Sequence, residues 1–160
     1  MFEPRSALPG TGGMVGLDTN VLLRAFVANG DPQEEDAKAL IRGLSKEHPG
    51  FIAQATLIEF FWNLRRGYRF SKSECLSIID RLVRSPSIEF DDGEGVVRAL
   101  MLAEGGADFP DALIHTTFEQ FQCGEAATFD RKAAQKLGWR LLGAEGTAEE
   151  SADEGTIARN

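Results

Sequence analysis

The chain has 160 residues, of which 42% are hydrophobic, and this fits a single domain with a substantial core. No apolar run is long enough to cross a membrane, and the N-terminus lacks the charged and apolar regions of a signal peptide, so we expect a cytoplasmic protein. The formal net charge of −8, taken alone, argues against a nucleic-acid partner.

The charge is unevenly distributed along the chain. The segment from Ala144 to the end carries five acids and one arginine, so half of the net charge lies there. Another part of the chain is locally basic, and it is either a solvated helix face or a surface for a substrate or partner. Its residues are Arg65, Arg66, Arg69, Lys72, Arg81 and Arg84. The net charge is therefore a weak argument against a polyanionic substrate.

Composition divides the chain into three parts. Residues 1–13 contain glycine and proline without periodicity and predict a flexible extension. Residues 14–143 carry the periodic pattern of a folded domain, and residues 144–160 predict an acidic, disordered tail. Cys75 and Cys123 lack metal-ligand spacing and are expected to be free thiols.

Strand-like and helix-like segments alternate through the first half of the domain. Residues 14–17 predict a short apolar strand that ends at Asp18, where a helix follows. A second helix is expected to start at residues 31–32, because proline suits the first turn of a helix. Residues 50–53 predict the second strand, and residues 56–69 predict the next helix.

The second half of the domain continues this alternation. Ser71 and Glu74 match a capping box at a helix start. The remaining elements are predicted as a strand at 87–90, a helix that ends at Gly105-Gly106, a helix at 108–121 with Ile114, Phe118 and Phe121 on its core side, a strand at 126–129, a helix at 131–137 and a strand at 139–142. Such alternation predicts an α/β fold, with a central, mostly parallel sheet of four to five strands covered by helices on both faces.

Acidic side chains stand where these elements begin or end. Binding sites in parallel sheets form beyond the carboxyl ends of the strands, and Asp18 and Asp130 both follow a predicted strand. Either residue could equally be a helix N-cap. Thr19 and Asn20 could orient Asp18 or contact a phosphate. Thr128 shares a strand face with Asp130, and its hydroxyl could hold a ligand or a metal-bound water.

Glu59 lies within an otherwise apolar stretch, residues 57–62. A carboxylate buried there without a partner would be costly. Glu59 could instead face solvent, but a ligand role explains its apolar setting better.

Asp108 and Asp111 are three residues apart and lie near one face of a helix start. The helix dipole stabilises acids in the first turn, which could explain either residue but does not require both. Asp111 is the better ligand, because apolar residues follow it, while Asp108 could be the cap and a supporting group. His115 is expected to form hydrogen bonds or lie at the surface, since imidazole has no advantage at a hard Mg²⁺ site.

These acids together predict an oxygen-ligand metal site. Converging carboxylates repel one another unless a cation lies between them, and Mg²⁺ or Mn²⁺ is the natural occupant. Without the metal, at least one of the acids should have a raised pKa.

The ordered set of acidic motifs resembles that of the PIN domain, and most closely that of VapC-type toxins from toxin–antitoxin pairs. The resemblance covers roughly residues 14–142 and implies a three-layer α/β/α fold. The motifs that carry it are Leu17-Asp18-Thr19-Asn20, Glu59, Asp108-Phe109-Pro110-Asp111-Ala112 and Thr128-Phe129-Asp130. The resemblance implies an acidic site of Asp18, Glu59, Asp111 and Asp130, which Asp108, Thr19, Asn20 and Thr128 would support.

The resemblance also implies a function, which is the Mg²⁺- or Mn²⁺-dependent hydrolysis of RNA. One or two metal ions would bind the scissile phosphate and activate a water molecule. Asp18 and Asp111 are the preferred direct ligands. Glu59 would bind a metal or position the water, and Asp130 would hold a weaker metal or act through water. A homodimer and a cognate antitoxin are the implied protein partners.

Two other functions compete with this hypothesis. A catalytically silent PIN-like module could bind RNA or protein as a scaffold, although such a module has no need to retain the acids. A phosphatase with an aspartyl-phosphate intermediate is a weaker alternative, because such enzymes usually place a second Asp two residues after the nucleophile, where this chain has Asn20.

Overall fold

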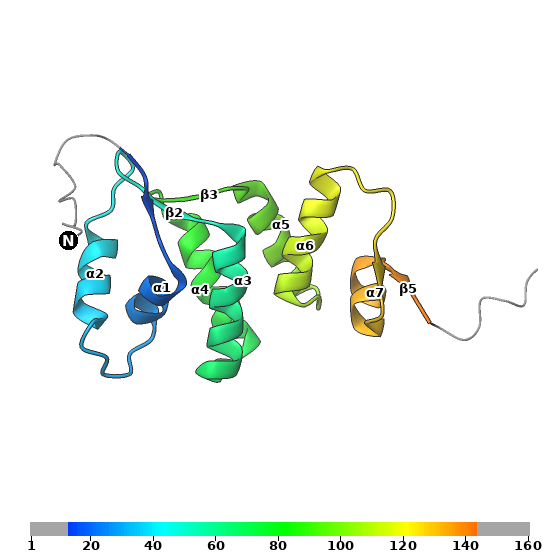
Figure 1. Cartoon of the computed structure of the whole chain (residues 1–160), viewed down its shortest axis with the longest axis horizontal. Helices are drawn as coiled ribbons and strands as arrows, with labels where there is room; N and C mark the ends of the chain where they lie inside the picture. Colours follow the sequence, from blue (N-terminus) through cyan, green and yellow to red (C-terminus); the bar gives the residue numbers. More distant parts are fainter. Residues whose placement is uncertain (1–12, 144–160) are drawn as a thin grey trace, which may run out of the picture.

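The computed structural model describes residues 13–143, so the expectations for residues 1–12 and for the tail at 144–160 lie outside the described residues. Helices and strands alternate along the chain as predicted (Figure 1). The elements are β1 (Val15–Gly16), α1 (Thr19–Phe26), α2 (Glu34–Arg42), β2 (Gly50–Ile52), α3 (Gln54–Trp62), the π-helical turn η1 (Asn63–Gly67), α4 (Lys72–Arg84), β3 (Ile88–Phe90), α5 (Gly93–Glu104), α6 (Phe109–Gln120), β4 (Ala127–Thr128), α7 (Arg131–Leu137) and β5 (Arg140–Leu141).

The predicted capping box at the start of α4 is confirmed. Ser71 Oγ accepts a hydrogen bond from the backbone N–H of Glu74 at 3.1 Å, and Glu74 Oε2 accepts one from the N–H of Ser71 at 2.7 Å. Two backbone donors that the first helical turn leaves unpaired are thereby satisfied. Local sequence thus explains where α4 begins.

Helix α2 begins at Glu34 rather than at the predicted residues 31–32. The Glu34 carboxylate accepts hydrogen bonds from the backbone N–H groups of residues 29–31, at distances of 2.7 to 3.1 Å. These bonds hold the preceding segment in a turn, so the helix starts two residues after the proline.

Helix α3 begins at Gln54, two residues earlier than predicted, and its continuation η1 is π-helical. The backbone N–H of Gln54 donates to the carboxylate of Asp91, which follows β3, at 3.0 and 3.1 Å. A residue distant in sequence therefore satisfies the first turn of this helix, which local patterns do not reveal.

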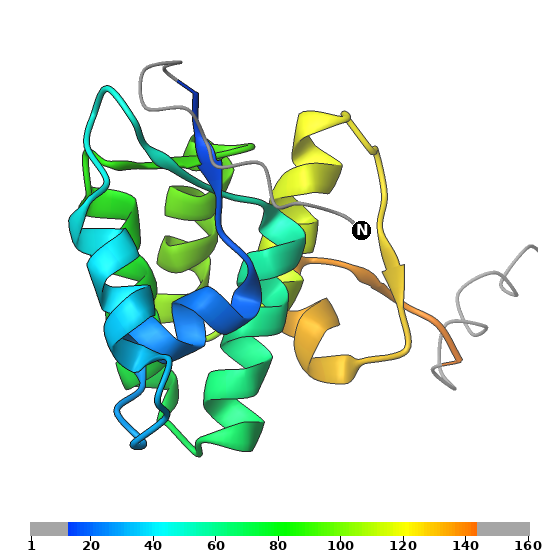
Figure 2. The same ribbon diagram turned by 60° about the vertical axis from the view of Figure 1, so that its left-hand side comes forward.

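The described strands are all parallel but are divided between two sheets. In the first sheet β2 lies between β1 and β3, with Gly50 opposite both Val15 and Ile88. The second sheet consists of β4 and β5, with Ala127 opposite Arg140. Figure 2 shows β1 (dark blue) and β4 (yellow-orange) as separate strands. The predicted α/β fold with parallel strands is confirmed, consistent with a three-layer α/β/α arrangement.

Helix α3 lies at the centre of the packing and contacts both α1 and α6. Its Leu57, Phe60 and Phe61 side chains are buried, as predicted, and the Phe61 ring packs 5.3 Å from the ring of Phe109 in α6. Burial of large aromatic side chains is a major source of stability. This contact fixes the start of α6 against α3.

The predicted core side of α6 is wrong. Ile114 and Phe121 are exposed, with 39% and 74% of their surface accessible. The buried positions are Phe109, Pro110, Ala112, Leu113 and Thr116. Most of these positions follow the i, i+3, i+4, i+7 spacing of a helical face, and this face packs against α3 and α5. Asp111 lies on the other side of α6 from this face and is nevertheless half-buried.

The two cysteines are free thiols, as expected, with Cys75 buried and Cys123 exposed. Burial raises the pKa of the Cys75 thiol to about 11, which keeps it protonated and unreactive at neutral pH. Within residues 13–143 no helix is long and apolar enough to cross a membrane.

Candidate acidic site

Asp18 is the N-cap of α1. Its Oδ1 atom accepts a hydrogen bond from the backbone N–H of Thr19 at 2.8 Å, and its side chain is exposed at the end of β1. Thr19 is 97% buried, and among the described residues its hydroxyl has no hydrogen-bond partner. Asn20 is exposed. A phosphate at this edge could therefore reach Asn20 but not the buried hydroxyl of Thr19.

Glu59 lies on the exposed side of α3, so its apolar sequence neighbours do not surround it. Phe60 and Phe61 follow it in sequence and point into the core. Residues next to each other on a helix point in directions about 100° apart, which places Glu59 outside the buried face. The argument that burial requires a ligand role for Glu59 is therefore wrong, and its carboxylate is accessible to solvent.

Asp108 and Asp111 lie at the start of α6. Asp108 occupies the N-cap position, but its side chain makes no capping hydrogen bond. Its carboxylate is therefore available for another partner. Asp111 is half-buried beside the buried residues Phe109, Pro110 and Ala112.

The pKa of Asp111 is raised above its usual range. Burial is the main cause, and the negative charges of Asp108 and Asp130 add to it, while the positive charge of Lys132 opposes it. Both burial and nearby like charges disfavour ionisation of a carboxyl group. This agrees with the expectation that at least one of the acids has a raised pKa, but burial contributes more to it than repulsion between the acids.

Asp130 is the N-cap of α7. Its Oδ1 atom accepts a hydrogen bond from the N–H of Ala133 at 3.0 Å, and Thr128 Oγ1 accepts one from the N–H of Asp130 at 3.0 Å. The capping role that the sequence allowed is therefore real. In this capping position, the charge of Asp130 still acts on Asp111.

The structure brings together only part of the predicted acidic set. The charges of Asp108 and Asp130 act on the pKa of Asp111, whereas Asp18 and Glu59 are not among the charges given for that shift. Across residues 13–143, no three His, Cys, Asp or Glu side chains are grouped closely enough to hold a metal ion. The acids as placed here do not fit a complete metal site.

Asp18 and Asp130 follow strands of different sheets. Asp18 follows β1 and Asp130 follows β4, whereas the prediction placed the carboxyl ends of both strands at one edge of a single sheet. In this structure β1 pairs with β2, and β4 pairs with β5 in the other sheet. Asp18 and Asp130 therefore lie at the edges of different sheets.

His115 forms hydrogen bonds, as expected. Its Nδ1 atom accepts a hydrogen bond from Trp139 Nε1 at 2.9 Å, and its Nε2 atom lies 3.1 Å from a carboxylate oxygen of Glu119. The Trp139 ring also packs 5.7 Å from that of Phe118. These contacts hold the segment after α7 against α6.

Lysines beside the acidic group were not among the predicted site residues. The positive charge of Lys132 acts on Asp111, and those of Lys132 and Lys136 act on Lys72, which is also close to Asp108. The available sequence signal was the i, i+4 spacing of Lys132 and Lys136 directly after Asp130. Their proximity to Lys72 depends on tertiary packing.

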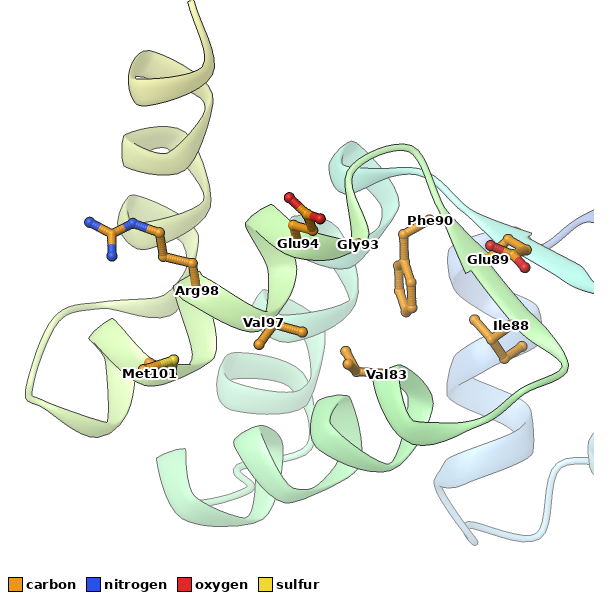
Figure 3. Close-up of a pocket in the computed structure, with 9 residues that line it drawn as sticks. All are labelled: Val83, Ile88, Glu89, Phe90, Gly93, Glu94, Val97, Arg98 and Met101. Carbon is orange, nitrogen blue, oxygen red and sulfur yellow. The ribbon is translucent and has the colours of Figure 1, made fainter. Parts of the chain in front are cut away.

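A groove on the described surface lies away from these acids. It has a volume of about 650 Å³ and runs between β3 and α5, with Val83 of α4 on its floor (Figure 3). Figure 3 shows Phe90, Val83 and Val97 facing one another across it. None of the predicted acids lines this groove, so its size does not make it the candidate active site.

Comparison with known proteins assigns the chain to a family. The profile of the PIN domain family matches residues 15–138, which is more than half of the chain and includes all of the predicted acids. No curated protein matches the chain in a sequence search. The chain belongs to the PIN domain family.

Proposed function

We propose that this protein is a metal-dependent ribonuclease and the toxin component of a toxin–antitoxin pair. PIN domains are generally nucleases, which supports a hydrolase that acts on phosphodiester bonds. The observation that carries the proposal is the placement of Asp108 and the half-buried Asp111 at the start of α6, where the charge of Asp130 also acts on Asp111. Such a grouping of negative charges is unfavourable in the free protein and is relieved when a cation binds.

The proposed ion is Mg²⁺ or Mn²⁺, because carboxylate oxygens are the donors that these ions prefer. Asp111 is its proposed central ligand, with Asp108 and Asp130, whose charges act on Asp111, as the other proposed ligands. Asp108, whose carboxylate caps no backbone N–H, is a stronger candidate than the sequence alone suggested.

Asp18 and Glu59 complete the proposed site. Both carboxylates are exposed to solvent, so neither would need to leave a buried environment to meet an ion or a phosphate. We propose that they act together with Asp111 on the substrate, with Asn20 and Thr128 as hydrogen-bonding groups beside them. A cognate antitoxin, a homodimer and a cytoplasmic location are further parts of the same proposal.

A second candidate function is a PIN-like module that binds RNA or protein without cleaving it. The observation that favours it is the absence, among the described residues, of a group of three side chains able to hold a metal ion. A scaffold would need neither Asp18 nor Glu59 near Asp111. The two functions differ in one measurable property, which is metal-dependent cleavage of RNA.

The decisive experiment is a cleavage assay on a mixed-sequence, fluorogenic single-stranded RNA with Mg²⁺, Mn²⁺ or EDTA. We expect cleavage with either metal and none with EDTA. Asp111→Asn should abolish cleavage, while the matched control Asp36→Asn, an exposed acid in the first turn of α2, should leave it unchanged. Binding of this RNA without cleavage under any metal condition would favour the scaffold.

Thermal unfolding gives an independent test of the ion. A ligand that binds only the folded state raises the melting temperature according to its concentration and affinity. Millimolar Mn²⁺ should therefore raise Tm of the wild-type protein and of Asp36→Asn but not that of Asp111→Asn. An unchanged Tm of the wild-type protein would count against a metal at this site.

A further inference from the structure

Four basic side chains converge beside the acidic group at the start of α6. We call them the cation cluster, and they come from η1, α4 and α7. Its members are Arg65, Lys72, Lys132 and Lys136. In a chain with a net charge of −8, such a concentration of positive charge requires an explanation.

Two lysines of this cluster lie against the loop before α6. Lys72 Nζ donates a hydrogen bond to the carbonyl oxygen of Ala107 at 2.7 Å. The Nζ atom of Lys136 lies 3.0 Å from the position that a Cβ atom on Gly106 would occupy, and Gly106 has a φ of +112° that favours glycine. The lysines thus approach closely the backbone that leads into Asp108.

The charges within the cluster repel one another. Burial is the main cause of the lowered pKa of Lys72, and the positive charges of Lys132, Arg65 and Lys136 lower it further, while Asp108 opposes them. Among residues 13–143, no ion pair includes any of these four cations. A mobile anion that binds there would relieve this repulsion.

The other arginines of the basic sequence segment mostly have structural partners. Arg84 Nε lies 2.7 Å from a carboxylate oxygen of Asp80. Arg66 packs over the Trp62 ring at 4.1 Å from its centroid, and Arg81 lies 5.7 Å from the ring centroid of Phe26. Of that segment, Arg65 and Lys72 join the lysines of α7, and both also donate to backbone, since Arg65 Nη1 lies 2.7 Å from the carbonyl oxygen of Phe70.

We propose that the cation cluster binds the phosphate backbone of the RNA strand next to the bond that is cleaved, an inference that rests on the proposed ribonuclease function. The cluster adjoins the acidic group, since Lys72 bonds the carbonyl oxygen of Ala107 next to Asp108, and Lys132 lies in the first turn of α7, which Asp130 caps. When the phosphate to be cleaved lies at Asp111, the next phosphates of the strand lie about one nucleotide away on either side, where the cluster is. Cations from three elements suit such a repeating anion, and they contact phosphates without reading base sequence.

The test measures RNA binding under conditions that prevent cleavage. A fluorescein-labelled single-stranded RNA of 12 nucleotides is titrated with the full chain in EDTA, at several salt concentrations, by fluorescence anisotropy. The variant is Lys132→Gln/Lys136→Gln, in which both replaced side chains are exposed and outside the core. The matched control is Lys38→Gln/Arg42→Gln, which removes two cations at the same i, i+4 spacing from α2, at the other end of the molecule from α7 (Figure 1).

We expect the α7 double variant to bind RNA about tenfold more weakly at low salt. The slope of the logarithm of its association constant against log salt should be less steep by about 1.4, since each single-strand phosphate contact contributes about 0.7. The α2 double variant should keep the wild-type affinity and slope. Circular dichroism checks that both double variants are folded. If the α7 double variant is unfolded, the single variant Lys132→Gln takes its place.

The outcomes separate this inference from the proposed function. If the α7 double variant keeps the RNA affinity and the salt dependence of the wild-type protein, the cation cluster is not an RNA site, even if the protein cleaves RNA. Binding that depends on the cluster without any cleavage would support the cluster and refute the nuclease. Equal competition by a glutamate 12-mer would overturn the RNA assignment in favour of an acidic peptide.

Discussion

Two regions of the molecule carry the predicted acids, and they differ in how their charges are arranged. At the first sheet, Asp18 caps α1 and Glu59 lies on the exposed side of α3. At the start of α6, burial raises the pKa of Asp111 and the charges of Asp108 and Asp130 add to this effect, and the cation cluster lies beside them. The acids of the first region are open to solvent, while those of the second crowd one another.

The difference lies in the neighbours of each carboxylate rather than in its capping hydrogen bond. Asp18 and Asp130 both cap helices, with hydrogen bonds of 2.8 and 3.0 Å to backbone N–H groups. Asp130 has a second carboxylate close by in Asp111, because the packing of α7 against α6 places it there. Both regions are needed for the proposed reaction, and the following predictions test whether they act as one site.

The largest expected effect concerns catalysis. Asp18→Asn and Asp111→Asn should each lower the rate of RNA cleavage by on the order of 10³-fold, because each removes a charged group of a proposed metal site. If the two regions act together, the double variant should be no worse than the more damaged single variant, since residues that act as a unit are not additive. Single-turnover cleavage rates give the comparison. Full activity in a folded Asp18→Asn protein would limit the site to the start of α6.

The next largest effect concerns stability, through the packing of the segment after α7 against α6 in the second region. Trp139→Ala removes the hydrogen bond to His115 and the ring packing against Phe118, and should cost about 2–3 kcal/mol. Hydrogen exchange should speed up in residues 123–143 and change little in the first sheet. Equal acceleration in both regions would show that they unfold as one unit.

A smaller effect of opposite sign is expected at Asp111. Its pKa is higher in the folded protein than in the unfolded chain, so ionisation of Asp111 lowers stability above that folded pKa. Asp111→Asn removes this cost and should raise Tm at pH 7 without metal. The difference should disappear as the pH falls below about 3.9, where the unfolded carboxyl group is also protonated. A lower Tm at pH 7 would contradict the crowding of this region.

The smallest effect is expected at Glu119, near the other end of α6. Its two carboxylate oxygens lie 2.5 and 2.6 Å from Arg98 of α5, and this hydrogen bond lowers the pKa of Glu119. The pair therefore contributes stability above the unfolded pKa of about 4.3, and this contribution is lost as the pH falls through the lower folded value.

Because both side chains of this pair are exposed, Glu119→Gln should cost less than about 1 kcal/mol at pH 7. Chemical denaturation at low and high salt measures this cost, which should shrink in 1 M salt. A cost that does not change with salt would show that the contact between α5 and α6 is not electrostatic. Glu119 and Asp111 lie on the same helix, and as the pH falls the stability contribution of Glu119 is thus expected to decrease and that of Asp111 to increase.

Much of the local structure could be predicted from the sequence, because its causes lie within a few residues. The capping box of Ser71 and Glu74, the helix from Arg131 to Leu137 and the alternation of strands and helices all follow from such short-range patterns. The acid Asp111 was also identified, since an acid followed by apolar residues at a helix start is visible in the chain itself.

Other features depended on contacts between residues far apart in the chain. The buried face of α6 was mispredicted because Ile114 and Phe121 are as apolar as Leu113, and only packing against α3 and α5 decides which of them is covered. The apolar sequence neighbours of Glu59 predict a buried carboxylate, whereas the orientation of α3 exposes it to solvent.

The sequence by itself determined the family, the order of the elements and the positions of the acids, because these depend on residue identity and short spacing. Only the tertiary structure decided which acids meet and which cations join them. Strand pairing and helix packing bring Asp130 to Asp111, and Lys132 to Lys72, while Asp18 stays at the edge of another sheet. Electrostatic interactions fall off with distance in space, so the charge of a site depends on distances that the order of residues does not specify.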